Sequence, residues 1–443
     1  AIFKDAGCKV EGEKVFLDRH WVMEMIGKAP SEFTITPRNP DRELIIGGKH
    51  ILFGNVSSPP NYFDLEIGRK VPGTRETCRN LLKLTQYFNC IHFAGGYPVE
   101  PVDIHASVRH LDVLFDKLTL GDKVVHAYSL GKERVEDVME MVRIAGGLSH
   151  DDFDAKPRMY TNINSTSPLK HDEPMIDGCL RLARRGQAIV VTPFTLAGAM
   201  APVTMAGAVT LSIAEALSAI ALFQFVRPGI PCAIGTFTSN VDMKSGAPAF
   251  GTPEYMRATQ MTGQLARFYG LPMRASGVCA ANVPDGQAMW ETSNSLWSAV
   301  QSGTNIVYHA AGWLEGGLVS SYEKFVMDAD QLGVLHHLAK GISVDENAQA
   351  MGAIREVGPG GHYLGCEHTQ ANFKSAFWRT DLFDYKPFET WAEEGSRDTM
   401  ALASARVEKL LADYVAPEID AGIREGLEEY VVNKKASMPD AFV

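Results

Sequence analysis

The sequence predicts an α/β fold: a (β/α)8 barrel of the TIM type, with an N-terminal helix and hairpin before it and a C-terminal helical extension after it. Short apolar, β-branched segments recur along the chain, and each is followed by a loop and a helical pattern. Strands that alternate with helices pair in parallel through right-handed crossovers. Eight such units fill roughly 290 residues, which matches one closed barrel. A doubly wound sheet is the alternative, but no GxGxxG motif follows the first strand, so the barrel is favoured.

The chain divides into three expected regions. Residues 1–48 hold a helix, RHWVMEMIGKAP, and a hairpin, FTITPRNPDRELIIGG, which we expect to close the lower end of the barrel. Residues 49–341 form the barrel. Residues 342–443 form a C-terminal extension packed on the barrel, and its part from about 395 to 434 is typical of one charged amphipathic helix.

The predicted barrel strands share short runs rich in β-branched and apolar residues. They are ILFGN (51–55), CIHFA (90–94), VVHAYS (124–129), RMYTNIN (158–164), AIVVT (188–192), PCAIGTF (231–237), LPMRASG (271–277) and NIVYHA (305–310). The clearest predicted helices are 74–88, 103–118, 133–145 and 253–269. Proline in the first turn after Thr252 and Asp172 predicts two helix starts.

Composition excludes several classes of protein. The formal net charge of -11 argues against a nucleic-acid partner, which needs a basic surface. The seven cysteines are scattered and form no CxxC pair, so we expect free thiols and a cytoplasmic location. The chain opens on AIFKDAG, without Met and without a signal-like segment, so we expect that it lacks some N-terminal sequence.

One apolar stretch has the length of a membrane span. From Ala188 to Phe225 the sole charged residue is Glu215, and the stretch exceeds the ~20 residues that cross a bilayer. Pro193 and Pro202 interrupt it, and no basic flank orients it. We therefore expect a buried strand, a loop and a buried helix, and no membrane partner.

The residues give weaker signals for two other kinds of chemistry. GHYLGCEH places His362, Cys366, Glu367 and His368 close together, and zinc favours such ligands, but the spacing is not a familiar one. No GxSxG motif is present, and Cys279, on a predicted barrel-top loop, is expected to be a small buried hydrophobe.

Aromatic and acidic residues gather at the predicted carboxyl ends of the strands, where barrel enzymes bind their substrates. The aromatics are Tyr62, Phe63, Tyr97, Phe194, Phe237, Phe250, Tyr308 and Trp313. The acids are Asp242, Glu254, Asp285 and Glu315. Aromatic faces beside negative charge favour a cationic or zwitterionic ligand. His309, which ends the last strand, is either a donor to a ligand carboxylate or a core histidine.

Over nearly its whole length the chain resembles the trimethylamine methyltransferase superfamily. The resemblance is carried by AIFKDAGCKV at the start, LAGAMAPVTMAGAV (196–209), YHAAGWLEGGLVSSYEKFVMD (308–328) and GPGGHYLGCEHT (358–369). It implies a barrel that moves a methyl group from a methylamine to the cobalt of a separate corrinoid protein. Trimethylamine enzymes of this superfamily carry pyrrolysine near the segment that matches GVCAANVPDG (277–286), where this sequence has standard residues. The chain therefore resembles the pyrrolysine-lacking branch, which acts on quaternary amines such as glycine betaine.

The resemblance and the rim together predict the substrate-binding residues. They are His309, Trp313, Glu315, Tyr62, Tyr97, Phe237, Asp242 and Phe250. His309 is expected at the substrate carboxylate, Trp313 and Glu315 toward the cation, and Gly316 with Gly317 where substrate or partner approaches closely. No catalytic residue is assigned and no directly bound metal is expected.

The expected cofactor is a corrinoid (cobalamin) carried by a partner protein, and the chain is expected to form a homo-oligomer. The alternatives are a zinc-dependent barrel methyltransferase using His362, Cys366 and His368, and a betaine-binding protein without methyl transfer.

Overall fold

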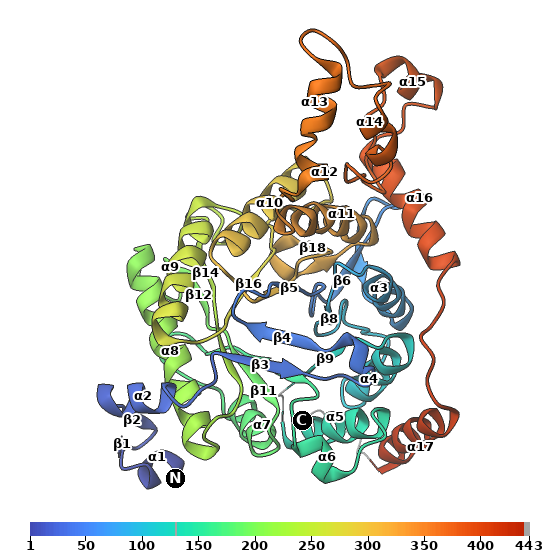
Figure 1. Cartoon of the computed structure of the whole chain (residues 1–443). Helices are drawn as coiled ribbons and strands as arrows, with labels where there is room; N and C mark the ends of the chain where they lie inside the picture. The colour runs from blue at the N-terminus through green and yellow to red at the C-terminus, as the bar shows by residue number, and fades with distance from the viewer. Residues whose placement is uncertain (129–130, 438–443) are drawn as a thin grey trace.

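The computed structural model describes residues 1–128 and 131–437 and contains a parallel barrel (Figure 1). Its eight-stranded sheet runs in the order β5-β17-β16-β13-β11-β10-β9-β8. A parallel bridge between Gly54, beside β5, and Phe93 in β8 joins the two end strands. The helices lie outside this ring (Figure 1). The predicted fold class is confirmed.

Each barrel strand lies inside a predicted segment. The strands are β5 (Leu52–Phe53), β8 (Phe93–Ala94), β9 (Val124–Ala127), β10 (Tyr160–Ile163), β11 (Ala188–Val191), β13 (Cys232–Gly235), β16 (Met273–Ser276) and β17 (Ile306–Tyr308). Ser129, the last residue of the third predicted strand, lies outside the described residues.

The outer helices follow the strands. They are α3 (Arg75–Tyr87), α4 (Arg109–Leu120), α5 (Lys132–Ala145), α6 (His150–Asp154), α7 (Glu173–Arg184), α8 (Met205–Val226), α9 (Pro253–Tyr269), α10 (Gly286–Gln301) and α11 (Tyr322–Ala339). The starts predicted after Asp172 and Thr252 are confirmed. The helix predicted over 103–118 instead begins at Arg109, and the backbone N–H of Arg75 donates to the Asp103 carboxylate at 2.9 Å. Asp103 thus accepts a hydrogen bond from the first turn of α3 and is not part of a helix itself.

The apolar stretch contains the predicted buried strand, β11, and the predicted buried helix, α8, but the connection between them includes a second strand, β12 (Phe194–Ala197). The helix α8 is long and apolar enough to cross a membrane by length and composition, a test that core helices also pass. Two thirds of its most apolar window, 67%, is buried inside the protein. Glu215 within it is buried and accepts hydrogen bonds from Ser167 Oγ and the Leu169 backbone N–H, each at 2.7 Å. The helix is therefore accounted for as part of the core.

The first part of the N-terminal segment packs beside α8, and its hairpin lies across one end of the barrel (Figure 1). The segment consists of α1 (Ile2–Asp5), β1 (Lys9–Glu11), β2 (Lys14–Phe16), α2 (Arg19–Ile26), β3 (Glu32–Ile35), a 3-10 turn (Pro40–Arg42) and β4 (Leu44–Gly47). The β3–β4 hairpin puts Phe33 and Ile35 into one apolar cluster with Tyr160 and Tyr308 of the barrel. The Thr36 backbone N–H donates to Pro157 O at 3.0 Å. The hairpin thus packs against the lower end of the barrel (Figure 1).

Two small sheets surround the upper end, built from segments that follow barrel strands. One joins β12 (Phe194–Ala197), β14 (Phe237–Val241) and β15 (Pro248–Ala249). The other joins β18 (Trp313–Leu314), β19 (Val319–Ser320), β6 (Asn61–Asp64) and β7 (Arg69–Pro72), with a 3-10 turn over Glu315–Gly317. These sheets place aromatic side chains around the barrel mouth.

The C-terminal region has two parts. The short helices α12 (Glu346–Gln349), α13 (Met351–Val357), α14 (Glu367–Asn372) and α15 (Phe388–Glu393) form an arm that projects from the barrel (Figure 1). The last two helices, α16 (Thr399–Ala412) and α17 (Ala421–Ser437), pack on the barrel helices. The single helix predicted from 395 to 434 is wrong: α16 ends at Ala412 and residues 413–420 are not helical, and Pro417 within them cannot donate to a continuing helix. Residues 438–443 of the predicted extension lie outside the described residues.

Stability should fall as the pH falls from about 6.5 toward 3, in part because of His92. The Phe53 backbone N–H donates to its Nδ1 at 2.9 Å, so the native ring is held neutral. Burial, with His336 and Lys123 nearby, lowers its pKa to about 3. The unfolded ring takes up a proton near pH 6.5 while the native ring does not. Below that pH, each further drop of one pH unit should lower the free energy of unfolding by up to about 1.4 kcal/mol because of this residue.

Chemical denaturation of the wild type and of His92→Gln at pH 7 and pH 5 measures this contribution. The glutamine can keep an acceptor for the Phe53 N–H but does not titrate. The wild type should lose about 2 kcal/mol more than the variant between these two pH values. Equal losses would contradict a neutral buried ring.

Candidate functional site

A cavity of about 380 Å³ opens at the carboxyl ends of the barrel strands. Its walls carry the aromatic side chains of Tyr128, Phe194, Phe237 and Trp313. Its other lining residues are Ser57, Ser58, His126, Asn162, Asn164, Met175, Thr192, Arg274, Tyr308, His309, Gly316 and Gly317. Among the described residues that line it there is one Arg and no Asp or Glu. This is the size and location expected of a small-molecule site in a barrel.

The segment 309–317 forms one wall and has an unusual backbone. Within it His309 (φ +54°), Gly312 (+91°), Glu315 (+47°) and both glycines of the 316–317 pair adopt positive φ angles. For His309 and Glu315 this conformation is strained and must be held by the surroundings. The Trp313 Nε1–H donates to Cys279 O at 3.0 Å, and the Glu315 N–H donates to Ala281 O at 2.8 Å. The strained wall is therefore tied to the loop after β16.

A buried ion pair also holds this segment. Lys324 and Asp328, one turn apart on α11, are both fully buried and pair with each other. The Gly312 N–H donates to Asp328 Oδ2 at 2.9 Å, and Lys324 Nζ donates to Thr292 Oγ1 at 2.9 Å. Burial raises the pKa of Asp328, and the Lys324 ammonium opposes that rise. Through the Gly312 N–H, the ion pair thus holds the backbone immediately before Trp313 in place.

Three of the predicted site residues meet in the cavity wall. The ring centroids of His309 and Trp313 lie 4.2 Å apart, and Phe237 lies 5.8 Å from His309 and 5.9 Å from Trp313. Phe250 is 1% exposed and packs behind them, 5.3 Å from Phe237. His309, Trp313 and Phe237 therefore form a contiguous aromatic wall, supported by Phe250.

The close approach expected at Gly317 is made by a neighbouring side chain. A Cβ on Gly317 would lie 2.5 Å from Cη2 of Trp313, and its φ is +102°. A Cβ on Gly316 would meet nothing nearer than Phe250, at 3.7 Å. Gly317 thus lets the Trp313 ring lie against the backbone.

The remaining predicted site residues do not line the cavity. Tyr62 packs against Tyr322 with ring centroids 4.6 Å apart. Tyr97 stands behind the wall: its ring lies 4.5 Å from that of Tyr128, whose hydroxyl accepts from the Tyr97 N–H at 2.8 Å.

Two predicted acids have other partners. Glu315 pairs with Lys70 of β7, Nζ to Oε1 at 2.7 Å. Asp242 is exposed and accepts from the Ser245 N–H and hydroxyl in a tight turn. Asp285, also in the predicted acidic rim, caps α10. Three of the four acids expected at the rim are therefore engaged in a turn, a helix cap and an ion pair instead of the wall, and the fourth, Glu254, lies in the first turn of α9.

The charged residue of the cavity is Arg274, which sequence reasoning missed. Its side chain is 2% exposed, and its Cζ lies 4.6 Å from the ring centroid of Tyr308 and 5.4 Å from that of Phe237. Nη1 donates to Thr236 O at 3.2 Å, while Nε has no partner and no carboxylate pairs with it in the described chain. Burial lowers its pKa to about 10, so it stays charged at neutral pH. An arginine inside an otherwise apolar predicted strand, LPMRASG, was the available signal.

Two histidines lie near this arginine. The Asn162 N–H donates to His126 Nε2 at 3.1 Å, so the proton of the neutral ring is on Nδ1. Nδ1 of His126 and Nδ1 of His309 are buried and have no partner. Burial is the main cause that lowers the pKa of both rings well below the ordinary value; the charges of Lys117 and then Arg274 add to it for His126, and the charge of Arg274 adds to it for His309. Both imidazoles are therefore neutral at pH 7.

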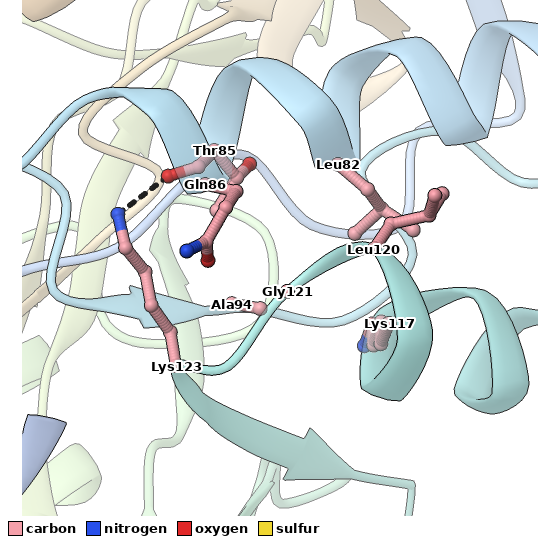
Figure 2. A pocket seen from close by; sticks show the side chains of 8 residues that line it. All are labelled: Leu82, Thr85, Gln86, Ala94, Lys117, Leu120, Gly121 and Lys123. Atoms are coloured by element: carbon pink, nitrogen blue, oxygen red, sulfur yellow. Dashed lines mark hydrogen bonds between the residues drawn. The ribbon is translucent and has the colours of Figure 1, made fainter. Parts of the chain in front are cut away.

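A second interior space, between α3 and α4, is only about 10 Å³ (Figure 2). This is room for about one water molecule. Lys123 Nζ donates to Thr85 O at 2.6 Å, the bond drawn in Figure 2, and to Phe88 O at 2.8 Å. Lys117 Nζ donates to Gly95 O at 2.6 Å. Both lysines serve the fold, and the space cannot hold an organic substrate.

Metal ligation finds no support in the described residues. Over residues 1–128 and 131–437 no group of three or more His, Cys, Asp or Glu side chains could hold an ion. In the arm, Cys366 Sγ lies 3.3 Å from Thr369 Oγ1, and His368 Nε2 lies 2.8 Å from Asn347 O. Cys279 is buried, donates to Trp313 O at 3.0 Å, and has its pKa raised to about 12 by burial. Its thiol is therefore not poised as a nucleophile.

Comparison with known proteins agrees along the whole chain. The family model described as trimethylamine methyltransferase (MTTB) matches residues 1–439. A glycine betaine methyltransferase of Desulfitobacterium hafniense (strain Y51) is 37% identical over 434 residues, which cover 98% of this chain and 90% of that protein. The trimethylamine methyltransferase MttB of Methanosarcina barkeri (strain Fusaro) is 29% identical over 441 residues, covering 97% and 88%.

A solved structure shares the fold. The monomethylamine methyltransferase MtmB of Methanosarcina barkeri superposes with a TM-score of 0.55 at 11% identity, over 94% of this chain and 87% of that one. At this identity the similarity shows a shared fold and nothing about the substrate.

Proposed function

The chain belongs to the trimethylamine methyltransferase family, and from that premise we propose that it demethylates a quaternary amine, glycine betaine first of all, with the cobalt of a corrinoid protein as methyl acceptor. The enzyme is a methyltransferase. The identity of its substrate and the identity of its methyl acceptor are what we propose.

The observation that carries the proposal is the aromatic wall of the cavity. Trp313, Phe237 and the neutral ring of His309 lie within 6 Å of one another on one side of it. Aromatic faces attract a quaternary ammonium by cation–π interaction, by about 2 kcal/mol or more when desolvated. A neutral His309 adds no repulsion to the bound cation. The wall thus suits a methylated nitrogen better than a phosphate or a sugar.

The chemistry of a quaternary nitrogen also fits the residues present. The reduced corrinoid supplies a strong nucleophile that accepts the methyl group. The C–N bond breaks with its electron pair going to nitrogen, so the amine leaves neutral and no proton need be delivered to it. The residues of this chain then have three tasks: to bind the amine, to orient one methyl group toward the mouth, and to exclude water. No general acid is needed, which agrees with neutral histidines and an alkaline-shifted Cys279 thiol.

The partner and the surroundings follow from the same proposal. The corrinoid protein docks at the barrel mouth, where the cavity opens. No nucleic acid or membrane takes part, in keeping with a net charge of -11 and a largely buried α8. No disulfide joins the seven cysteines, which all lie in the described residues, and this supports a cytoplasmic location.

We also propose that the chain forms a homo-oligomer through its projecting arm. Several large apolar side chains of the arm are mostly exposed, which is costly in an isolated chain. They are Ile342 (92%), Leu364 (85%), Phe377 (80%), Tyr385 (84%) and Phe388 (71%). Sedimentation of the purified chain tests this, and a monomer at micromolar concentration would contradict it.

Methyl transfer to reduced cobalamin tests the main proposal. Purified chain, mixed with a matching corrinoid protein or free cobalamin reduced to cobalt(I), should form methylcobalamin from glycine betaine and not from trimethylamine. Trimethylamine is excluded because the resemblance implies a need for pyrrolysine, which this sequence lacks. A chelator should leave the rate unchanged, since the described residues offer no group of three or more His, Cys, Asp or Glu side chains that could hold an ion.

The outcomes separate the alternatives. Loss of activity with a chelator, together with one zinc per chain, would favour the zinc-dependent methyltransferase. Binding of betaines without any methylcobalamin, even with the corrinoid protein, would favour a betaine-binding protein.

A further inference from the structure

We propose that Arg274 binds a carboxylate of the substrate and thereby selects zwitterionic quaternary amines over purely cationic ones. The proposal rests on the proposed function and assigns a role to the one charged side chain of the described cavity lining. The position of His309 in the sequence instead predicts that His309 meets the carboxylate.

The first reason is the unmatched charge of Arg274. Burying a charged group is expensive unless it is paired and hydrogen-bonded, and buried arginines normally meet a carboxylate. Here the guanidinium has one backbone acceptor, Thr236 O at 3.2 Å, and Nε has none. The described chain offers it no ion pair, although the side chain lines an open cavity. An anionic group in that cavity would supply the missing partner.

The second reason is that another hydrogen-bond donor, His126, lies near Arg274. His126 carries its proton on Nδ1, which is buried and has no acceptor. His126 and Arg274 both flank Tyr308: the His126 ring centroid lies 6.2 Å and the Arg274 Cζ 4.6 Å from its ring centroid. A carboxylate can accept from a guanidinium and an imidazole at once. A trimethylammonium group has no hydrogen-bond acceptor, so neither donor can bind it.

The third reason is the polarity of the cavity along the barrel axis. Arg274 stands in register with Ile306, two residues before the paired strand ends at Ser276 and Tyr308. Its Cα thus lies roughly 6–7 Å before those ends, measured along the strand, and so deeper in the barrel. Trp313 and the adjoining glycines follow the strand and belong to the mouth. A zwitterion bound with its carboxylate below and its ammonium above would present a methyl group to the mouth.

A role in the fold alone is the competing explanation. The guanidinium packs over the rings of Tyr308 and Phe237, and these contacts could justify it without any ligand. Such a role would make every ligand bind less well when Arg274 is lost. A carboxylate-binding role would weaken the binding of carboxylated ligands alone. The ratio of two affinities therefore separates the explanations.

The experiment measures binding of glycine betaine and of tetramethylammonium by calorimetry, with the full chain. Both probes have a quaternary nitrogen, and only the first has a carboxylate. Arg274→Met should weaken glycine betaine roughly 10- to 100-fold, the usual effect of losing a charge-assisted contact. Tetramethylammonium affinity should change by less than about twofold, or improve as a repelling charge is removed. Arg274→Lys should give an intermediate loss for glycine betaine, because it keeps the charge but not the bidentate fork.

Arg267→Met is the matched control. Arg267, on α9, also donates Nη1 to a backbone carbonyl, Ser302 O at 2.5 Å, but it is exposed and does not line the cavity. Its loss should leave both affinities unchanged. If Arg274→Met fails to fold, the lysine variant still reports the ratio. Equal weakening of both probes by a folded Arg274 variant, or no weakening of glycine betaine, would overturn the proposal.

The two proposals fail in distinguishable ways. If the wild-type chain binds glycine betaine through Arg274 but forms no methylcobalamin, the proposed function is contradicted and the proposed carboxylate site is supported. A wild-type chain that demethylates glycine betaine, with an unchanged affinity ratio in the Arg274 variants, would do the reverse.

Discussion

Replacing Asp328 with Ala is expected to lower the free energy of unfolding by about 3–5 kcal/mol, as when one partner of a buried ion pair is removed. The change leaves the Lys324 ammonium fully buried with Thr292 Oγ1 as its remaining partner. It also removes the acceptor of the Gly312 N–H. A second loss should follow in substrate binding, because Gly312 precedes Trp313 in the strained wall.

The double variant Lys324→Met with Asp328→Asn is the control. It removes both charges and keeps an oxygen that can accept from Gly312, so most of the lost stability should return. Denaturation by urea measures both variants against the wild type. A single variant that is as stable as the double one would show that the ion pair does not carry this energy.

Replacing Gly317 with Ala is expected to cost about 2–4 kcal/mol of stability and to weaken the binding of a quaternary amine roughly 30-fold. The new Cβ would lie 2.5 Å from the Trp313 ring, and φ +102° is strained for any L side chain. Relief requires the ring to move, and the ring is part of the aromatic wall. The loss of affinity then equals the loss of most of one cation–π contact.

Gly316→Ala is the matched control at the neighbouring position. Its φ of +59° lies in the left-handed region that Ala tolerates at a cost of about 1–2 kcal/mol, and its nearest neighbour would be Phe250 at 3.7 Å. Affinity for glycine betaine or tetramethylammonium should stay near that of the wild type. If both alanine variants bound equally well, Trp313 would not be a wall of the binding site.

The barrel could be predicted from the sequence because its signals are local. Each strand is a short apolar run, and the caps at Asp172 and Thr252 stand beside the helices they start. One of the two errors concerns a long-range contact and the other a local helix end. Asp103 accepts from the Arg75 N–H at the start of α3, which is distant in sequence, and Pro417 lies in a non-helical segment although the charged pattern continues on both sides.

The site could be predicted only in part, for a similar reason. Sequence places a residue near a strand end but not its partners. His309, Trp313 and Phe237 turn toward one cavity, whereas Glu315 reaches Lys70 on a strand 245 residues away. Arg274 escaped because a charged residue inside a strand is not expected in a core, and its pocket exists only once the barrel has closed.

The hairpin beneath the barrel has a consequence for kinetics. With β3 and β4 packed on the lower end, the proposed amine and the proposed methyl acceptor must share the upper one. A carrier protein seated there first would bar the substrate, so the productive order is amine, then carrier. The demethylated product, still beneath the carrier, leaves only after the carrier does. An excess of carrier should therefore slow turnover, and the rate of carrier departure sets an upper bound on the rate of product release.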